Sequence, residues 1–412
     1  MTRPDRQNKL NHEAEVIYAA RQEVTSLYIH VPFCGGRCHY CDFYTLASPA
    51  PESLEIWQEG ILHELSRLAG EADDNGVLLA PLQTLYFGGG TPSFVPPRMI
   101  ASIIRNARGL FGLDGDSDIT LEANPESAGK EEQKHLLDQW REAGVNRISF
   151  GVQSMSDRLL AAAGRRHTAA EAAFAVRAAK RAGFKHIACD LITGLPGQSM
   201  ADLDDTLDQI EKLPLDHLSA YALSVEEGTP FDLLRRKNPQ AFPDDDLERE
   251  MTHRLIERLG RMGFIHYEIS NFAREGAESR HNLVYWKADS YLAAGPSAAS
   301  YLGGIRRSQP ASLADWYQGV TDPEEGPFSA GLIEERLDEK AARIETMVLG
   351  LRLMEGVSRR RFFERHGTGF EDVFGSRLNR LQEEGLVHLD EGGVRLTARG
   401  LDFADYAARS LL

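Results

Sequence analysis

The chain has 412 residues, of which 42% are hydrophobic and 26% are charged. This composition predicts a large folded domain with a smaller one and argues against disorder. The formal net charge of −16 argues against a general nucleic-acid or anionic-membrane surface, because both need an excess of Lys and Arg. No signal peptide or transmembrane run is visible. We therefore expect a cytoplasmic protein, in which closely spaced cysteines bind metal or act in redox chemistry.

From Leu27 onward, short β-rich runs alternate with segments of helical period, which is typical of βα units around a parallel sheet. The expected strands begin the runs SLYIHVPF, LQTLYFGGGTPS, DITLEANPES, VNRISFGVQS, HIACDLITGLPGQS, HLSAYALSVEEGTPF and IHYEISNFAR. Polar or glycine-rich residues follow each strand. In barrels and open α/β sheets the active site lies at that end, so we predict an α/β protein with a partial, six-stranded (β/α) barrel.

Composition turns to Pro, Gly and acidic residues around 319–331, as at a domain junction. Beyond it, a helix within EERLDEKAARIETMVLGLRLM, a helix at SRLNRLQEEG, a hairpin at LVHLDEGGVRLT and a last helix predict a winged-helix-like domain. The acidic chain and the lack of a dense basic helix favour a structural or lid role over DNA binding. We divide the chain into an N-terminal extension (1–24), a barrel with its extension (25–318), a linker (319–339) and a C-terminal domain (340–412).

Three of the four cysteines lie on the loop after the first strand. Cys34, Cys38 and Cys41 have the spacing C-x3-C-x2-C, and thiolates on one loop bind zinc or iron–sulfur clusters. A structural zinc site would need His30 or His39 as its fourth ligand. A cubane held by three cysteines instead leaves one iron open to a substrate or cofactor.

Aromatic residues surround these cysteines, and the fourth cysteine lies elsewhere. Phe33, Tyr40 and Phe43 would shield a cluster from water and tune its potential. Cys189 stands beside Asp190 within a β-run, where we expect a buried, inert thiol.

The cysteine spacing after a first strand resembles that of the radical S-adenosylmethionine (SAM) superfamily. Within it, the chain is similar to the HemN/HemW group of coproporphyrinogen dehydrogenases and heme chaperones, and most similar to the heme-chaperone branch. The ordered motifs that carry this resemblance are YIHVPFC, YFGGGTPS, LEANPES, RISFGVQS, DLITGLPGQ, SAYALSVEEGTPF, YEISNFA, HNLVYW and LGLRLMEGV. The resemblance implies a [4Fe-4S] cluster on the three cysteines, with SAM bound to the open iron.

The resemblance also implies a set of SAM-contacting residues: Tyr28, Tyr40, Gly89, Gly90, Thr91, Glu122, Gln153, Arg165, Asp190 and Ala222. Glycines bring bare backbone close to a ligand, although a tight turn would need them too. Arg165 could pair with a carboxylate through two hydrogen bonds, although a surface ion pair is the alternative. Tyr28 and Ala222 could equally be ordinary strand residues.

The motif HNLVYW, residues 281–286, distinguishes the heme-chaperone branch. The resemblance implies that His281 is a heme-iron ligand, and Tyr285 and Trp286 could pack on a porphyrin face. A hydrogen-bonded structural histidine is the alternative. Ala299 stands in the cofactor site where relatives usually have histidine, so that position provides no ligand here. Phe43 replaces a further cysteine of the dehydrogenases.

We therefore expect a heme chaperone that delivers heme to an apo-cytochrome of a respiratory complex, with transient membrane contact and no nucleic-acid partner. The alternative is a radical SAM enzyme acting on a porphyrin, either an oxygen-independent coproporphyrinogen III dehydrogenase or a heme-opening methyltransferase. A structural zinc protein on a barrel is the third hypothesis. Whether SAM is cleaved stays open.

Overall fold

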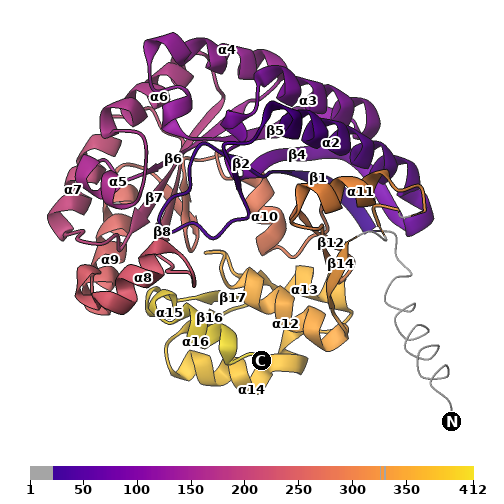
Figure 1. The fold of residues 1–412 in the computed structure, drawn as a ribbon. Helices are drawn as coiled ribbons and strands as arrows, with labels where there is room; N and C mark the ends of the chain where they lie inside the picture. Colours follow the sequence, from indigo (N-terminus) through magenta and orange to yellow (C-terminus); the bar gives the residue numbers. More distant parts are fainter. Residues whose placement is uncertain (1–21, 325, 329–330) are drawn as a thin grey trace.

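The computed structural model describes residues 22–324, 326–328 and 331–412. Its main body is a nine-stranded sheet surrounded by helices, and a smaller domain lies beside it (Figure 1). The strand order is β11-β1-β4-β5-β6-β7-β8-β10-β9. Six neighbouring parallel strands confirm the predicted partial barrel: β1 (Gln22–Val31), β4 (Val77–Gly89), β5 (Leu113–Ala123), β6 (Arg147–Gln153), β7 (His186–Thr193) and β8 (His217–Ala222).

The two edges of the sheet differ from the predicted βα repeat. At one edge, β11 (Leu292–Ala294) runs parallel to β1. At the other, the run IHYEISNFAR forms a hairpin of β9 (Ile265–Glu268) and β10 (Asn271–Ala273), with β10 antiparallel to β8. A turn at residues 269–270 reverses the chain, so this run is not the single strand that we predicted.

Helices cover the outer face of the barrel, as the outer ring in Figure 1 shows. They are α2 (Pro51–Glu71), α3 (Pro97–Phe111), α4 (Lys134–Ala143), α5 (Asp157–Ala162), α6 (Ala169–Arg181), α7 (Met200–Ile210), α8 (Pro230–Lys237) and α9 (Asp245–Arg261). Proline occupies the first position of α2, α3 and α8, where its missing N–H costs nothing. Thr168 and Glu171 form a capping box at α6.

The segment after β10 contains α10 (Arg280–Trp286), α11 (Leu313–Thr321) and a small sheet of β12 (Ala299–Leu302), β13 (Ile305–Ser308) and β14 (Leu332–Arg336). β14 lies inside the predicted linker 319–339 and pairs with β13, so one edge of its backbone is hydrogen-bonded in a sheet. Residues 325, 329 and 330 of that linker, and residues 1–21 of the predicted extension, lie outside the described residues. The last three residues of the predicted extension, 22–24, pair with β4 as part of β1.

The C-terminal domain has its own apolar core. Its elements are α12 (Glu339–Gly350), β15 (Val357–Ser358), α13 (Arg359–His366), α14 (Phe370–Glu383), β16 (Val387–Leu389), β17 (Gly393–Leu396), α15 (Ala398–Asp402) and α16 (Ala404–Arg409). Phe362, Phe370 and Phe374 fill the space between its helices and the sheet β15-β17-β16. The two predicted helices and the hairpin are present as α12, α14 and β16–β17, but the prediction missed β15 and α13, and the single last helix is two short ones, α15 and α16. α12 begins at Glu339, and the residues before it form β14.

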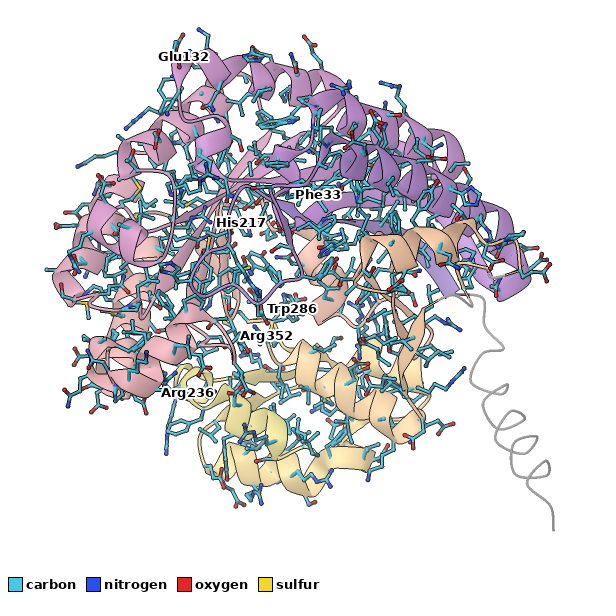
Figure 2. All side chains as sticks on the ribbon, viewed as in Figure 1. Phe33, Glu132, His217, Arg236, Trp286 and Arg352 are labelled. Atoms are coloured by element: carbon cyan, nitrogen blue, oxygen red, sulfur yellow. The ribbon has the colours of Figure 1, made fainter. Side chains whose placement is uncertain are left out.

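Polar and aromatic contacts hold the two parts together. Arg361 and Arg365 of α13 both bind the Asp289 carboxylate at 2.6 Å. The Arg352 guanidinium lies 4.4 Å from the centre of the Trp286 ring, which belongs to α10 (Figure 2). The C-terminal domain is therefore fixed directly against α10. None of the helices in the described residues is long and apolar enough to span a membrane.

Candidate functional site

Site residues from neighbouring strands meet at one edge of the barrel. Glu122 of β5 lies opposite Ser149 of β6 in the strand register. Gly151 of β6 lies opposite Asp190 of β7, and Ala222 of β8 pairs with the last residue of β7. Because the carboxyl ends of parallel strands share one edge, residues far apart in the sequence converge there.

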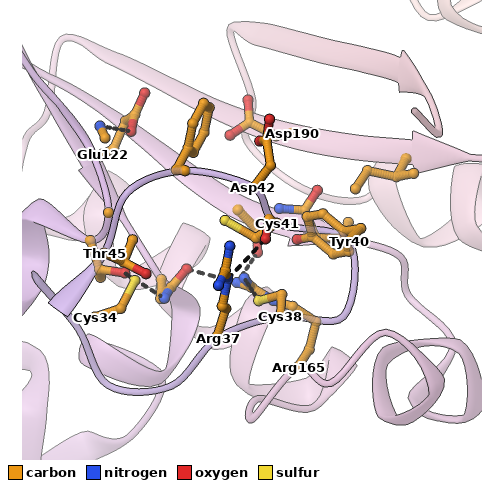
Figure 3. Close-up of a pocket in the computed structure, with 18 of the residues that line it drawn as sticks. Cys34, Arg37, Cys38, Tyr40, Cys41, Asp42, Thr45, Glu122, Arg165 and Asp190 are labelled. Carbon is orange, nitrogen blue, oxygen red and sulfur yellow. Dashed lines mark hydrogen bonds between the residues drawn. The ribbon is translucent and has the colours of Figure 1, made fainter. Parts of the chain in front are cut away.

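A cavity of about 530 Å³ opens at this edge (Figure 3). It is lined by most of the predicted site residues, namely Cys34, Cys38, Tyr40, Cys41, Gly89, Gly90, Thr91, Glu122, Gln153, Arg165, Asp190 and Ala222. Its volume lies within the roughly 300–1,000 Å³ of small-molecule sites. Tyr28, His281 and Ala299 are not among the lining residues.

The loop that carries the cysteines is anchored at several points. Cys34 ends β2 (Phe33–Cys34), which pairs with β3 (Leu46–Ala47). The His39 backbone N–H donates to the Ala163 carbonyl at 3.0 Å, and its ring Nδ1 lies 2.8 Å from the Ala162 carbonyl. Neither His39 nor His30, the two candidate fourth zinc ligands, lines the cavity among the described residues.

A chain of hydrogen bonds connects two of the cysteines. The Cys34 thiol lies 2.9 Å from the Thr91 hydroxyl, which accepts a hydrogen bond from Asn124 Nδ2 at 3.1 Å. Arg165 donates to Asn124 Oδ1 at 2.7 Å, to the Gly151 carbonyl at 2.7 Å and to Cys38 Sγ at 3.3 Å. The positively charged guanidinium therefore holds two groups of the cavity wall in place and also faces the Cys38 sulfur.

The donor set fits an iron–sulfur cluster. All four cysteines are free thiols, and three of them line one cavity, which provides the thiolate ligands that such clusters take. Burial raises the pKa of Cys34 and of Cys41, so a bound metal would be needed to keep these groups ionised. Among the described residues, no three His, Cys, Asp or Glu side chains converge closely enough to hold a single metal ion. Cys189 is fully buried in the barrel core.

Two carboxyl groups face the same cavity from neighbouring strands. Burial, with a smaller effect of Asp190, raises the pKa of Glu122 to about 7. Hydrogen bonds from Tyr86 and Gly89 lower this pKa but only partly offset the effect of burial. Burial likewise raises the pKa of Asp190 to about 6. Both side chains are only half-buried, because they border the cavity. A cationic ligand would restore their ionised forms, so this wall suits a positively charged group.

The glycine run permits close packing within the chain. A Cβ atom on Gly90 would lie 2.7 Å from the Phe33 carbonyl, and one on Gly89 would lie 2.5 Å from the His30 ring. Gly89 also has a positive φ of 105°, a backbone angle that residues other than glycine rarely adopt. Thr91 N then donates to the Phe33 carbonyl at 2.7 Å. The run thus brings β4 against the cysteine loop while leaving bare backbone at the cavity.

Gln153 has an unusual backbone conformation. Its φ is +67°, and the pairing of β6 with β7 shifts register between Gly151 and Gln153. Such left-handed residues cost about 1–3 kcal/mol and cluster at functional sites. The bulge directs Gln153 into the cavity wall.

Tyr28 and Ala299 lie apart from the cysteine cavity. The Tyr28 hydroxyl is 3.2 Å from His30 Nδ1, and its ring stacks on Tyr86 with centroids 6.1 Å apart. Ala299 begins β12 and pairs with Ser308. Neither residue contributes to the wall that holds the other predicted SAM contacts.

His281 lies inside the barrel, on the inner side of α10. Its Nδ1 is 2.7 Å from the Thr84 hydroxyl and its Nε2 is 2.8 Å from the Tyr285 hydroxyl. Its ring stacks on Tyr86 at 4.8 Å, and burial lowers its pKa to about 3. Both ring nitrogens are therefore engaged by the chain itself, as in the structural alternative, and the motif is helical rather than a strand or loop.

Sequence reasoning missed several residues that complete the site. Asn124 joins Thr91 to Arg165, and Ser149 donates to Asp190 at 3.3 Å. Tyr86 donates to Glu122 at 2.7 Å. Asn124 and Tyr86 stand two residues from Glu122 and Gly88, so the two-residue period of a strand could have indicated them.

Comparisons with known proteins agree with this arrangement. The family model of the radical SAM superfamily matches residues 28–210, and that of the HemN C-terminal domain matches residues 337–403. The heme chaperone HemW of Bacillus subtilis is 35% identical over 379 residues, covering 91% of this chain and 96% of the relative. HemW of Mycobacterium tuberculosis is 36% identical over 392 residues, covering 94% of each.

A solved structure shares the fold. Coproporphyrinogen III oxidase (HemN) from Escherichia coli superimposes with a TM-score of 0.79 at 22% identity. The match covers 98% of this chain and 93% of that one. It supports the barrel with its C-terminal domain, and at this identity it carries no argument about activity.

Proposed function

Because the chain belongs to the HemW family of the radical SAM superfamily, we propose that it is a heme chaperone that binds heme and delivers it to an apo-cytochrome. The observation that carries the proposal is the presence of two features in one chain. The first is the cysteine cavity at the strand ends. The second is the HNLVYW motif on α10.

In this proposal Cys34, Cys38 and Cys41 hold a [4Fe-4S] cluster, as membership of the superfamily implies. When bound, the cluster would supply electrons for chemistry on SAM, and the three cysteines would leave it a position that SAM could occupy. The protein's own residues provide the rest of the SAM site. The half-buried carboxyl groups of Glu122 and Asp190 suit the positively charged ammonium of SAM, and Arg165 suits its carboxylate.

The heme is received next to α10. His281 is the iron ligand that the family motif indicates, but it can bind iron only after its hydrogen bonds to Thr84 and Tyr285 break. Each buried hydrogen bond contributes roughly 0.5–1.5 kcal/mol net. Two such bonds are a modest cost compared with a metal–ligand bond, so a movement of α10 on heme loading is energetically accessible.

The acceptor in this proposal is an apo-cytochrome of a respiratory complex, reached from the cytoplasm through transient contact with the membrane surface. The net charge of −16 disfavours lasting adsorption to anionic lipid. Contact with the acceptor itself would then supply the specificity.

One residue of the cavity wall favours heme delivery over a chemical reaction on a porphyrin. Phe43 occupies the place of a further cysteine in the dehydrogenases; the residue is 59% exposed and lines the cysteine cavity. A phenyl group provides neither a thiol for chemistry nor a metal ligand.

The test begins with anaerobic reconstitution, followed by iron and sulfide analysis. Heme is then titrated, and coproporphyrinogen III is supplied separately with SAM and a reductant. We expect about four iron atoms per chain, stoichiometric heme and no protoporphyrinogen. Zinc without iron would exclude the cluster, and turnover of coproporphyrinogen III would replace delivery by the dehydrogenase function.

A further inference from the structure

Asn124 connects two of the cysteines through one neighbour on each side. It directly follows β5 and lines the cysteine cavity. Its Nδ2 lies 3.1 Å from the Thr91 hydroxyl, which is 2.9 Å from Cys34 Sγ. On the other side, Arg165 Nη2 lies 2.7 Å from Asn124 Oδ1, and Nη1 of the same guanidinium lies 3.3 Å from Cys38 Sγ (Figure 3). A single amide group therefore contacts a hydrogen-bond partner of each cysteine.

The chemistry of the donors and acceptors fixes the direction of this hydrogen-bond chain. A guanidinium has N–H donors and no acceptor, so the side chain of Asn124 must turn its carbonyl oxygen toward Arg165. Its NH2 group then faces Thr91, and the Thr91 hydroxyl accepts this hydrogen bond. The hydroxyl keeps its own hydrogen, which remains available for the sulfur of Cys34. Every donor therefore points from Arg165 toward Cys34.

The backbone of Asn124 is held on both sides of its side chain. Its N–H donates to the Ser93 hydroxyl at 3.1 Å, and its carbonyl accepts from the Ser127 N–H at 3.0 Å. The Ser93 and Ser127 hydroxyls lie 2.9 Å apart, which joins the turn after β4 to the turn after β5. Because its backbone is fixed in this way, the amide loses little further freedom when it makes its two contacts.

In the proposed function Cys34 and Cys38 bind the cluster as thiolates, which carry no proton. A hydrogen bond to either sulfur must then be donated by the partner, and Thr91 and Arg165 both have a hydrogen to donate. A hydrogen bond to an anion is roughly twice as strong as one between neutral groups. Reduction adds negative charge to a cluster and its ligands, so donors to the sulfurs favour the reduced form and raise the reduction potential.

The positive charge of Arg165 adds to this effect at both cysteines. The guanidinium faces Cys38 directly, whereas it reaches Cys34 through the amide and the hydroxyl. Hydrogen bonds in a chain polarise one another, and each is stronger where water is excluded. Cys34 and Thr91 are both buried. Loss of the amide would therefore weaken the contact at Cys34 and release one of the contacts that hold the guanidinium beside Cys38.

We infer that Asn124 is a positioning residue that raises the reduction potential of the cluster. Its NH2 group orients the Thr91 hydroxyl toward Cys34, and its carbonyl oxygen holds the guanidinium of Arg165 in place. The inference rests on the cluster of the proposed function and adds a residue that sets its potential. It is compatible with SAM binding, because the guanidinium has more N–H groups than its bonds to Cys38, Asn124 and Gly151 use.

The test variant is Asn124→Asp, which keeps the size of the side chain but replaces its NH2 group by an acceptor. The Thr91 hydroxyl would then donate to the new carboxylate, and Cys34 would lose its donor. After anaerobic reconstitution of the full chain, the potential is measured in a redox titration followed by electron paramagnetic resonance of the reduced cluster. We expect the equilibrium constant for reduction to fall by at least about tenfold, which is about 59 mV for one electron.

Two further variants separate the hydrogen bond from the added charge. Thr91→Val removes the donor to Cys34 without adding a charge and should also lower the potential. Because Asn124 acts on Cys34 through Thr91, the double variant should shift the potential by less than the sum of the single shifts. The matched control is Asn238→Asp, the same change at an exposed position after α8, and its potential should equal that of the unaltered protein.

Iron and sulfide analysis checks that each variant holds its cluster before the potentials are compared. Unchanged potentials in Asn124→Asp and Thr91→Val, or fully additive shifts in the double variant, would overturn the inference while the chaperone function stands. If Asn124→Asp incorporates no iron, an unchanged potential in Thr91→Val is sufficient to overturn it. If the unaltered protein incorporates no iron, the cluster of the proposed function fails, and the role of Asn124 fails with it.

Discussion

Replacing Glu122 by Gln is expected to change the free energy of unfolding more favourably at pH 8 than at pH 5. Burial raises the pKa of Glu122 from 4.5 to about 7 in the folded protein. As the pH rises, the unfolded chain loses this proton first, so folding becomes less favourable between pH 4.5 and about 7. The carboxyl group thus contributes no penalty below pH 4.5 and its full penalty above pH 7.

The size of the effect follows from the two pKa values. One pKa unit corresponds to about 1.4 kcal/mol, so a rise from 4.5 to about 7 gives roughly 2–3 kcal/mol between pH 5 and pH 8. Because Glu122 borders the cavity, water screens part of this penalty. We therefore expect the free energy of unfolding of Glu122→Gln, relative to the unaltered protein, to be about 1–2 kcal/mol higher at pH 8 than at pH 5.

The assay is denaturant unfolding under anaerobic conditions, followed by tryptophan fluorescence. All four tryptophans precede residue 319, so the signal reports the barrel rather than the C-terminal domain. At each pH the free energy of unfolding of the variant is compared with that of the unaltered protein. Effects of the substitution that do not depend on pH cancel when the two differences are compared. The control is Glu142→Gln at an exposed position of α4. An equal difference at both pH values, or a relative loss at pH 8, would refute the reasoning from burial.

Three further predictions concern the same edge of the barrel. Cys38→Ala should lose the cluster iron, whereas Cys189→Ala, a change in the core, should keep it by iron analysis. Gly90→Ala places a Cβ 2.7 Å from the Phe33 carbonyl and should therefore lower iron incorporation. Its control, Gly109→Ala, adds a Cβ in open space on α3 and should raise the free energy of unfolding by about 0.5–1 kcal/mol. Gln153→Gly should relieve the positive φ of 67° and raise that free energy by about 1 kcal/mol, yet weaken SAM binding in calorimetry; stronger SAM binding would contradict its place in the site.

The strand-end residues were predictable because each belongs to a short local motif. Glu122, Asp190 and Gly89 each follow a hydrophobic run of strand period, and parallel strands bring their carboxyl ends together. The hydrogen bonds among them were less visible. Arg165 lies 127 positions from Cys38 and 41 from Asn124, and one sequence contains no direct signal for such pairs.

The surroundings of HNLVYW were not predictable from the motif itself. His281 is buried because its partner Thr84 lies 197 positions away on β4, and only the folded barrel brings them together. The same applies to β14, which forms a strand because β13 supplies an antiparallel partner. The ion pairs of Arg361 and Arg365 with Asp289 likewise join residues that lie 72 and 76 positions apart in the sequence, and only the folded chain brings their two domains together.

The measurement that tests the account most directly is heme transfer. The reconstituted protein is loaded with one equivalent of heme and mixed anaerobically with an apo-cytochrome of a respiratory complex, and the absorption spectra of donor and acceptor are followed. Heme is expected to move to the cytochrome, and coproporphyrinogen III is expected not to be consumed under the same conditions. Heme that stays on the protein, or conversion of coproporphyrinogen III, would contradict this expectation.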